Sequence, residues 1–247
     1  MGQRFEVLGE AAARIPPISQ PVVQADRSNG SSAMRAAGGA ADNEISRLIQ
    51  QLFLPSPAGE HNRLVVFGGI DRGAGCSWVC ARAAEMLAMQ ISGRVCLIDA
   101  NLQSPSLHTY FQAEVSPGFA DAISQPQPVE QFLRSTWTNH LWLMTSGAAG
   151  PETIGKLRPE RVQKRFAELR EEFDYLLVDV PAITATGDGI LLSQFSDGIV
   201  LVIASNSTRR ESARMAKQSL EDSKVPILGA VLNKRTYPIP EAVYRRL

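Results

Sequence analysis

The sequence predicts an α/β fold in which a mostly parallel sheet carries helices on both faces. Three observations support this prediction. Short apolar runs alternate with stretches of helical periodicity along most of the 247 residues. The runs are almost purely apolar, which is typical of parallel strands buried on both faces. The length suits one large domain with a tail better than two ordinary domains. We therefore expect a single domain built around one sheet.

The expected strands are spaced so that a helix fits between most of them. Apolar runs bounded by turn residues predict strands at 64–67, 95–98, 141–144, 175–180, 199–204 and 227–232. Helical spacing predicts helices at 77–90, 118–134, 159–172 and 208–222. Ligands of such sheets bind beyond the carboxyl ends of the strands, so the residues that follow each strand are the candidates for a functional site.

The two ends of the chain differ from this core. Residues 1–43 are predicted to be a flexible arm, because Ala, Pro, Gly, Ser and Gln dominate much of it and prolines break any period. A helix is predicted over 44–54, where apolar residues recur at helical spacing before Pro55. Together with a core at 61–235 it forms the domain 44–235, and residues 236–247 form a C-terminal tail.

Composition excludes several classes of function. The chain holds 25 basic and 25 acidic residues, so no excess charge predicts binding to nucleic acid or to an anionic membrane. Its apolar runs are far shorter than the roughly 20 residues of a membrane-spanning helix, and a secretory hydrophobic segment is absent. Cys76, Cys80 and Cys96 lie in or beside core elements, which favours reduced thiols. We expect a cytoplasmic protein without a membrane span.

A glycine-rich turn follows the first predicted strand. Residues 63–77 read as an apolar strand, a turn containing Gly73 and Gly75, and a helix that opens at Ser77. This order is typical of a P-loop, in which backbone N–H groups and a helix N-terminus cradle phosphate, and it predicts a P-loop NTPase-like fold. The strict pattern G-x-x-x-x-G-K-[ST] fails twice, because Ile70 replaces its first glycine and Cys76 its lysine. A turn without a ligand is the competing interpretation of this segment alone.

Two carboxylates end predicted strands that we expect to be neighbours in the sheet beside this turn. Asp99 follows the second strand and Asp179 the fourth. Each could be a helix cap or a turn residue, but with Ser77 they form a plausible magnesium or water-positioning set. Asp99 and Asp179 are therefore the candidate catalytic residues, and Ser77, Asp99 and Asp179 are the candidate Mg²⁺ ligands.

These residues resemble the cytosolic P-loop domain of bacterial tyrosine kinases of capsular and exopolysaccharide synthesis. That family is a branch of the deviant-Walker ATPases, which also include partition and division-site proteins. The resemblance spans roughly residues 44–235. The family's Pro-Gly-Glu-Gly-Lys-Ser-Thr loop falls on 72–78. Its second acidic motif falls on 99–108 and its Walker B stretch on 173–181. Further matches lie at 118–123, 145–147 and 231–233.

The resemblance implies a nucleotide site and a surface for self-association. ATP or ADP with Mg²⁺ is the implied cofactor. Glu44 and Arg47 fit the family's Glu-x-x-Arg-x-x-Arg helix, which mediates ring-like assembly of a homo-oligomer, although Gln50 breaks its third position. The implied nucleotide-binding residues are Arg72, Gly73, Ala74, Gly75, Cys76, Ser77, Trp78 and Asn233, the last of which resembles an asparagine that contacts the base.

The resemblance also implies a partner and a tail that accepts phosphate. The partner is the cytosolic part of a membrane polysaccharide copolymerase or export complex, which would hold this protein at the periphery of the inner membrane. Family kinases end in a tyrosine cluster, whereas this tail offers Tyr237 and Tyr244. These two tyrosines are candidate phosphoacceptors, with packing or exposed tail residues as the alternative.

The departures from the family pattern occur at residues expected to contact phosphate or metal, rather than at residues that form the fold. Cys76 replaces a lysine, Trp78 a threonine, Asn101 an aspartate and Gln103 an arginine. Removing a cation aimed at transition-state charge commonly costs about 3 to 4 kcal/mol, or a factor of ~10² to 10³ in rate. We therefore predict weak or absent nucleotide affinity and a catalytically impaired kinase-like protein, a pseudokinase that regulates the export complex by binding.

Three other interpretations concern the same turn. An active tyrosine kinase or ATPase would use Arg72 in place of the lysine. A partition ATPase fits less well, because Asp71 stands near the position of its signature lysine. Cys76, at a helix N-terminus beside Arg72, is also a candidate redox-sensitive thiol with a lowered pKa, against the simpler interpretation of a neutral small residue.

Overall fold

The computed structural model describes residues 38–53, 62–148, 157–205 and 207–234. All described strands belong to one compact unit, which runs from Asp42 to Leu247. This confirms the expected single domain. The predicted arm up to residue 37 and the tail 236–247 lie outside the described residues. Helix α3 (Gly38–Phe53) begins before Asn43, where the predicted arm ends.

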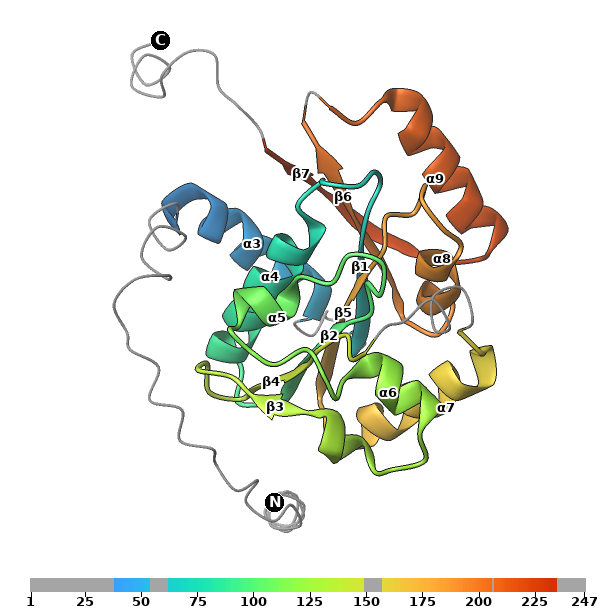
Figure 1. Cartoon of the computed structure of the whole chain (residues 1–247). Helices are drawn as coiled ribbons and strands as arrows, with labels where there is room; N and C mark the ends of the chain where they lie inside the picture. The colour runs from blue at the N-terminus through green and yellow to red at the C-terminus, as the bar shows by residue number, and fades with distance from the viewer. Residues whose placement is uncertain (1–37, 54–61, 149–156, 206, 235–247) are drawn as a thin grey trace, which may run out of the picture. The chain divides into compact units, whose positions relative to one another are not determined.

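The described strands form one sheet. Its order is β3-β4-β2-β5-β1-β6-β7, and every neighbouring pair is parallel except β3 with β4. The mostly parallel α/β architecture is therefore confirmed (Figure 1). The strands are β1 (Leu64–Gly69), β2 (Val95–Asp99), β3 (Arg134–Ser135), β4 (Leu141–Met144), β5 (Tyr175–Val180), β6 (Gly198–Ala204) and β7 (Ile227–Asn233).

Helices cover both faces of the sheet, as expected. One buried cluster joins one face to α3, α4 and α5, and the other cluster joins the opposite face to α6, α7, α8 and α9. Burial of these apolar side chains is the main stabilising contribution to the fold. The helices are α4 (Cys76–Gln90), α5 (Leu107–Tyr110), α6 (Phe119–Ser124), α7 (Pro159–Glu172), α8 (Asp188–Ser193) and α9 (Arg210–Asp222).

One predicted helix is wrong. The segment 118–134 is divided into α6, a 3₁₀ turn η1 (Val129–Phe132) and the start of β3. Pro126 and Pro128 explain the division, because proline lacks an N–H donor and disfavours helical conformation in the residue before it. Apolar side chains at helical spacing on both sides of the prolines produced the single-helix prediction.

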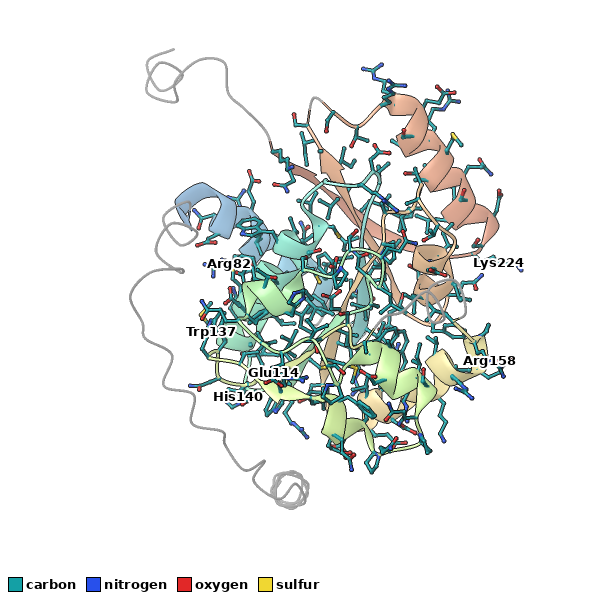
Figure 2. All side chains as sticks on the ribbon, in the orientation of Figure 1. Arg82, Glu114, Trp137, His140, Arg158 and Lys224 are labelled. Atoms are coloured by element: carbon teal, nitrogen blue, oxygen red, sulfur yellow. The ribbon has the colours of Figure 1, made fainter. Side chains whose placement is uncertain are left out.

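A buried carboxylate ties the helices of one face together. Glu85 on α4 accepts hydrogen bonds from Arg82 (3.1 Å), from the Tyr110 hydroxyl (2.9 Å) and from the Trp137 indole N–H (3.1 Å). Arg82 also makes a bidentate contact with Asp42 on α3 (2.9 and 2.9 Å). Arg82 and Trp137 are labelled in Figure 2. This network links α3, α4, α5 and the hairpin that precedes β4.

The helices of the described segments are too short or too polar to cross a bilayer.

Candidate functional site

The glycine-rich turn joins β1 to α4 as predicted. β1 ends at Gly69 and α4 begins at Cys76. Gly73 and Gly75 have φ values of +77° and +82°, which side-chain-bearing residues rarely adopt. The amide of Ile70 donates to Val202 O (3.0 Å) on β6, so a neighbouring strand fixes the start of the turn.

The loop after β5 also forms hydrogen bonds with the glycine-rich turn. Thr184 donates to Ile70 O through both its hydroxyl (2.7 Å) and its amide (3.2 Å). Its hydroxyl also lies 3.2 Å from Asp71 Oδ1. Sequence reasoning did not single out Thr184. Its place shortly after the Asp179-Val180-Pro181 strand end was the available signal, because residues that follow parallel strands gather at one edge of the sheet.

The two candidate carboxylates lie side by side. Asp99 and Asp179 occupy paired positions on the adjacent strands β2 and β5, so their side chains share one face of the sheet. Both side chains are fully buried. The structure therefore brings together the two strand ends that the sequence selected.

The two carboxylates differ in their hydrogen bonding. Asp99 accepts bonds from the backbone amides of Asn101 (3.2 Å), Ser106 (3.1 Å) and Leu107 (3.0 Å). Burial nevertheless raises the pKa of Asp99 to about 6, against the lowering effect of these bonds. Asp99 thus fixes the loop 101–107 and the start of α5.

Neither oxygen of Asp179 has a hydrogen-bond partner among the described residues. Burial raises its pKa to about 8, and the charge of Asp99 adds to the rise. The side chains of Ser77 and Cys76 lie close enough to the Asp179 carboxyl to lower its pKa partly. Their contacts with it do not have the geometry of a standard hydrogen bond. A buried carboxyl without a partner or a cation is more stable in its protonated form.

Arg72 turns toward the rim of the site. Its guanidinium Nη2 donates to Gln103 Oε1 at 2.7 Å, and the arginine is exposed. Because Gln103 lies in the loop after Asp99, this contact joins the glycine-rich turn to the second acidic segment. No described cation pairs with Asp179.

Of the two interpretations of Cys76, the structure favours the neutral residue over the thiol with a lowered pKa. Burial raises the pKa of its thiol well above the usual value, and the charge of Asp179 raises it further. Burial raises the pKa of Cys80, one turn along α4, in the same direction. Arg72 is not among the groups that shift this pKa, and its guanidinium extends to Gln103 instead. Cys76 is therefore a neutral thiol rather than a reactive thiolate.

The remaining predicted nucleotide-site residues lie around the turn in different ways. Ala74 is buried and Ser77 is half-buried at the start of α4. Trp78 packs against the buried cluster that contains α3 and α4. Asn233, at the end of β7, donates to Ala74 O at 2.9 Å and so braces the turn itself.

The predicted self-association residues are accessible, and the predicted phosphoacceptors are not described. Glu44 and Arg47 are exposed on α3, whose buried face includes Ile45 and Ile49. Tyr237 and Tyr244 lie outside the described residues.

The site suits a magnesium ion better than a reacting triphosphate. Mg²⁺ binds one or two carboxylates and completes its shell with phosphate oxygens and water, and the free oxygens of Asp179 beside Ser77 offer such ligands. The described His, Cys, Asp and Glu side chains nowhere gather in threes around a possible metal position. Cys76 stands where the P-loop pattern has the lysine that reaches the phosphate oxygens of a triphosphate.

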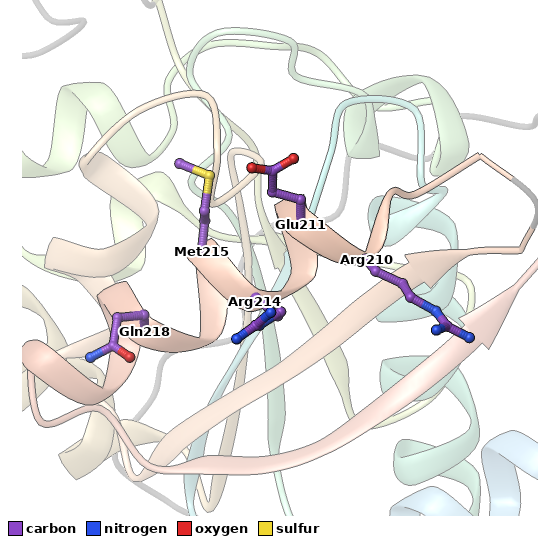
Figure 3. Close-up of a pocket in the computed structure, with 5 residues that line it drawn as sticks. All are labelled: Arg210, Glu211, Arg214, Met215 and Gln218. Carbon is purple, nitrogen blue, oxygen red and sulfur yellow. The ribbon is translucent and has the colours of Figure 1, made fainter.

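A separate hollow lies on the surface of α9. Arg210, Glu211, Arg214, Met215 and Gln218 line it (Figure 3). None of these residues belongs to the glycine-rich turn or to the acidic strand ends.

The fold and the site together define a P-loop NTPase-like protein. Three solved structures share this fold at about 20% identity, which supports the fold alone. The chimerical protein CapA2B2 aligns with a TM-score of 0.72 and 20% identity over 84% of this chain and 92% of its own. The kinase domain of Escherichia coli tyrosine kinase ETK gives 0.67 and 21% over 72% and 71%. The septum site-determining protein MinD of Pyrococcus horikoshii, solved with Mg-ADP, gives 0.60 and 18% over 74% and 76%.

Sequence relatives identify the family. No family model matches the chain. Tyrosine-protein kinase YwqD of Bacillus subtilis is 34% identical over 161 residues, which are 65% of this chain and 68% of YwqD. Tyrosine-protein kinase ptk of Acinetobacter johnsonii is 29% identical over 173 residues, 70% of this chain but 23% of that protein. The chain belongs to the bacterial tyrosine-protein kinase family, and the predicted resemblance is confirmed at this level.

Proposed function

We propose that this protein is a catalytically impaired member of its kinase family that regulates a polysaccharide chain-length or export complex by binding to it. The observation that carries the proposal is the unpaired, buried carboxyl of Asp179 beside Cys76. In an active P-loop a lysine reaches the β and γ phosphate oxygens. Here the corresponding position holds a neutral thiol, and the nearest carboxyl favours its protonated form.

Electrostatics supports weak nucleotide binding. A triphosphate brings several negative charges to a turn whose contribution is then limited to backbone N–H groups and the positive end of α4. Arg72, the basic residue of the turn, lies at the exposed rim with Gln103. Trp78 is half-buried and packs against the apolar cluster around α4, so it contributes no hydroxyl to the turn.

Calorimetric titration of the full chain with Mg-ADP and Mg-ATP tests the nucleotide part of the proposal. We expect no heat, or binding only near millimolar ligand. ATP hydrolysis or tyrosine phosphorylation at rates typical of kinases, abolished by Ser77→Ala or Asp179→Ala, would overturn the proposal. Asn43→Ala, at an exposed position on α3, is the control that should change neither rate.

An active enzyme is the second candidate, and the position of Arg72 favours it. The guanidinium spans from the glycine-rich turn to the loop after Asp99, so a bound phosphate would need only to displace Gln103. In that case Arg72→Ala abolishes ATP turnover, whereas Gln103→Ala preserves or raises it. Absence of turnover in the parent protein rejects this candidate.

The partner and self-association require a separate test. Glu44 and Arg47 project from α3 into solvent, which supports a role for this helix in contacts between copies or with the copolymerase. We expect sedimentation velocity to show assembly, or purified cytosolic copolymerase segment to bind, and Glu44→Ala with Arg47→Ala to weaken either association. Unchanged association in that variant removes α3 from the proposal without affecting the nucleotide prediction.

A further inference from the structure

Helix α9 carries its charges against its own dipole. A helix N-terminus has a partial positive charge that favours acidic side chains, and its C-terminus favours basic ones. The N-cap of α9 is Arg209, followed by Arg210 and Arg214, and its last turn has no basic residue. Glu221 and Asp222 stand at that end instead. Glu211 in the first turn offsets part of this effect. Three arginines at the N-terminal end still oppose the dipole, so the stability of the helix does not account for them.

The arginines are also unpaired. Arg209, Arg210 and Arg214 are exposed, and none forms an ion pair with another described residue. Lys217, by contrast, is 2.7 Å from Glu221. The N-terminal half of α9 thus presents free guanidinium groups, while its buried residues Ala216 and Leu220 attach the helix to the sheet.

An apolar side chain and a hollow lie within the same surface. We define the α9 patch as Arg210, Glu211, Arg214, Met215 and Gln218, which line the hollow. Met215 is 63% exposed, an unusual state for a large apolar residue. Figure 3 shows Arg210 and Arg214 extending to one side of the helix and Glu211 and Met215 to the other. Arginine and methionine are enriched in protein interfaces.

We propose that the α9 patch is a docking surface for an acidic segment of a partner protein, in which carboxylates flank an apolar side chain. The carboxylates would pair with Arg210 and Arg214, bidentately where geometry allows, and the apolar side chain would cover Met215. The proposal concerns a surface outside the glycine-rich turn and does not depend on whether nucleotide binds there.

Charge distribution favours an acidic peptide over a polyanion or a membrane. Nucleic acid and anionic lipid attract an extended basic surface. Glu211 lies inside the patch, and Glu221 and Asp222 end the helix. The chain as a whole has equal numbers of basic and acidic residues, so it supplies no long-range attraction. A short segment, in contrast, needs only the local pair of arginines.

Fluorescence anisotropy with a labelled synthetic peptide of repeating Glu-Glu-Leu tests the proposal on the full chain. We expect saturable binding that weakens as salt rises. The double variant Arg210→Glu with Arg214→Glu should weaken it at least about tenfold, since two attractive contacts become repulsive. Met215→Ser should weaken binding several-fold, because it removes the apolar contact.

The control is Arg158→Glu, which makes the same type of substitution, with half the charge change of the double variant, at an exposed arginine that caps another helix, α7. It should leave peptide binding within twofold of the parent. Glutamate at position 210 is favoured by the helix dipole, so the thermal unfolding midpoint of the double variant should not fall, and loss of binding cannot be assigned to unfolding.

Four results would overturn the proposal. These are absence of peptide binding to the parent protein, binding that the double variant leaves unchanged, equal loss in Arg158→Glu, and tighter binding to duplex DNA or to phosphatidylserine vesicles than to the peptide.

Discussion

Replacing Asp179 by asparagine should stabilise the protein, and the gain should grow with pH. The carboxyl has an ordinary pKa of 3.8 in the unfolded chain and about 8 in the folded protein. Since its folded pKa is the higher one, the folded state binds the proton more tightly, and stability is lost as pH rises from 4 toward 8. At pH 7 the loss is on the order of 4 kcal/mol, because each pH unit above the unfolded pKa costs about 1.4 kcal/mol.

Asparagine has nearly the same shape and no charge to desolvate. The stabilisation by Asp179→Asn should therefore increase by roughly 3 to 4 kcal/mol between pH 5 and pH 8. Urea unfolding, followed by circular dichroism at several pH values with a chelator present, measures this difference. The burial of Asp99 produces a pH dependence of the same sign between about pH 4 and 6, which persists in the variant.

Asp197→Asn is a control with the opposite sign. Although burial alone would raise the pKa of Asp197, the hydrogen bond from Arg170 and the amides of Leu64 and Arg63 lower it below its usual value. Its stabilisation is present above about pH 4 and lost as pH falls, so this variant should be less stable than the parent at neutral pH. If Asp179→Asn instead destabilises the protein at pH 8, or its effect is independent of pH, a cation does reach Asp179 and the argument for an uncharged site fails.

Three further predictions concern the turn and its supports. Cys76 should react with iodoacetamide at pH 7 more slowly than free cysteine, because its pKa is raised; faster labelling, detected by mass spectrometry, would contradict this. Gly75→Ala should cost about 1 to 2 kcal/mol of unfolding free energy, because φ is +82° and a Cβ would meet the Asn233 amide. Gly229→Ala, where a Cβ meets open space, is the control for urea unfolding, and an equal loss there would refute the explanation. Tyr110→Phe should cost about 1 kcal/mol, since it removes one donor from buried Glu85, and an unchanged denaturation midpoint would show that this bond contributes nothing.

The sheet was largely predictable because its strands are short apolar runs that end in glycine, aspartate or turn residues. β5 is an example, since Tyr175–Val180 matches its predicted bounds. The two-residue strand β3 and the short helices α5 and α8 were not predicted. They are too short to show a period, and their positions depend on contacts with distant parts of the chain.

The residues of the site were predictable, but the directions of their side chains were not. The strand-end rule selected Asp99 and Asp179 because carboxyl ends of parallel strands share one edge. It could not show that Arg72 reaches Gln103 or that Trp78 packs against the buried cluster around α4, since both depend on side-chain rotamers and tertiary contacts. The two interpretations of Cys76 could not be separated from the sequence for the same reason, because burial rather than the nearby Arg72 decides the pKa of its thiol.

Burial also explains how the scaffold accommodates a cysteine at the position that the P-loop pattern assigns to a lysine. Removing that cation alone would leave an ionised Asp179 buried without a partner, at a cost of several kcal/mol. Because its pKa is raised, the Asp179 carboxyl binds a proton instead, and the free-energy cost of that protonation is smaller. A neutral Cys76 and a protonated Asp179 are therefore compatible neighbours in one buried site. Under the proposed function, both groups stay uncharged while the glycine-rich turn keeps its geometry.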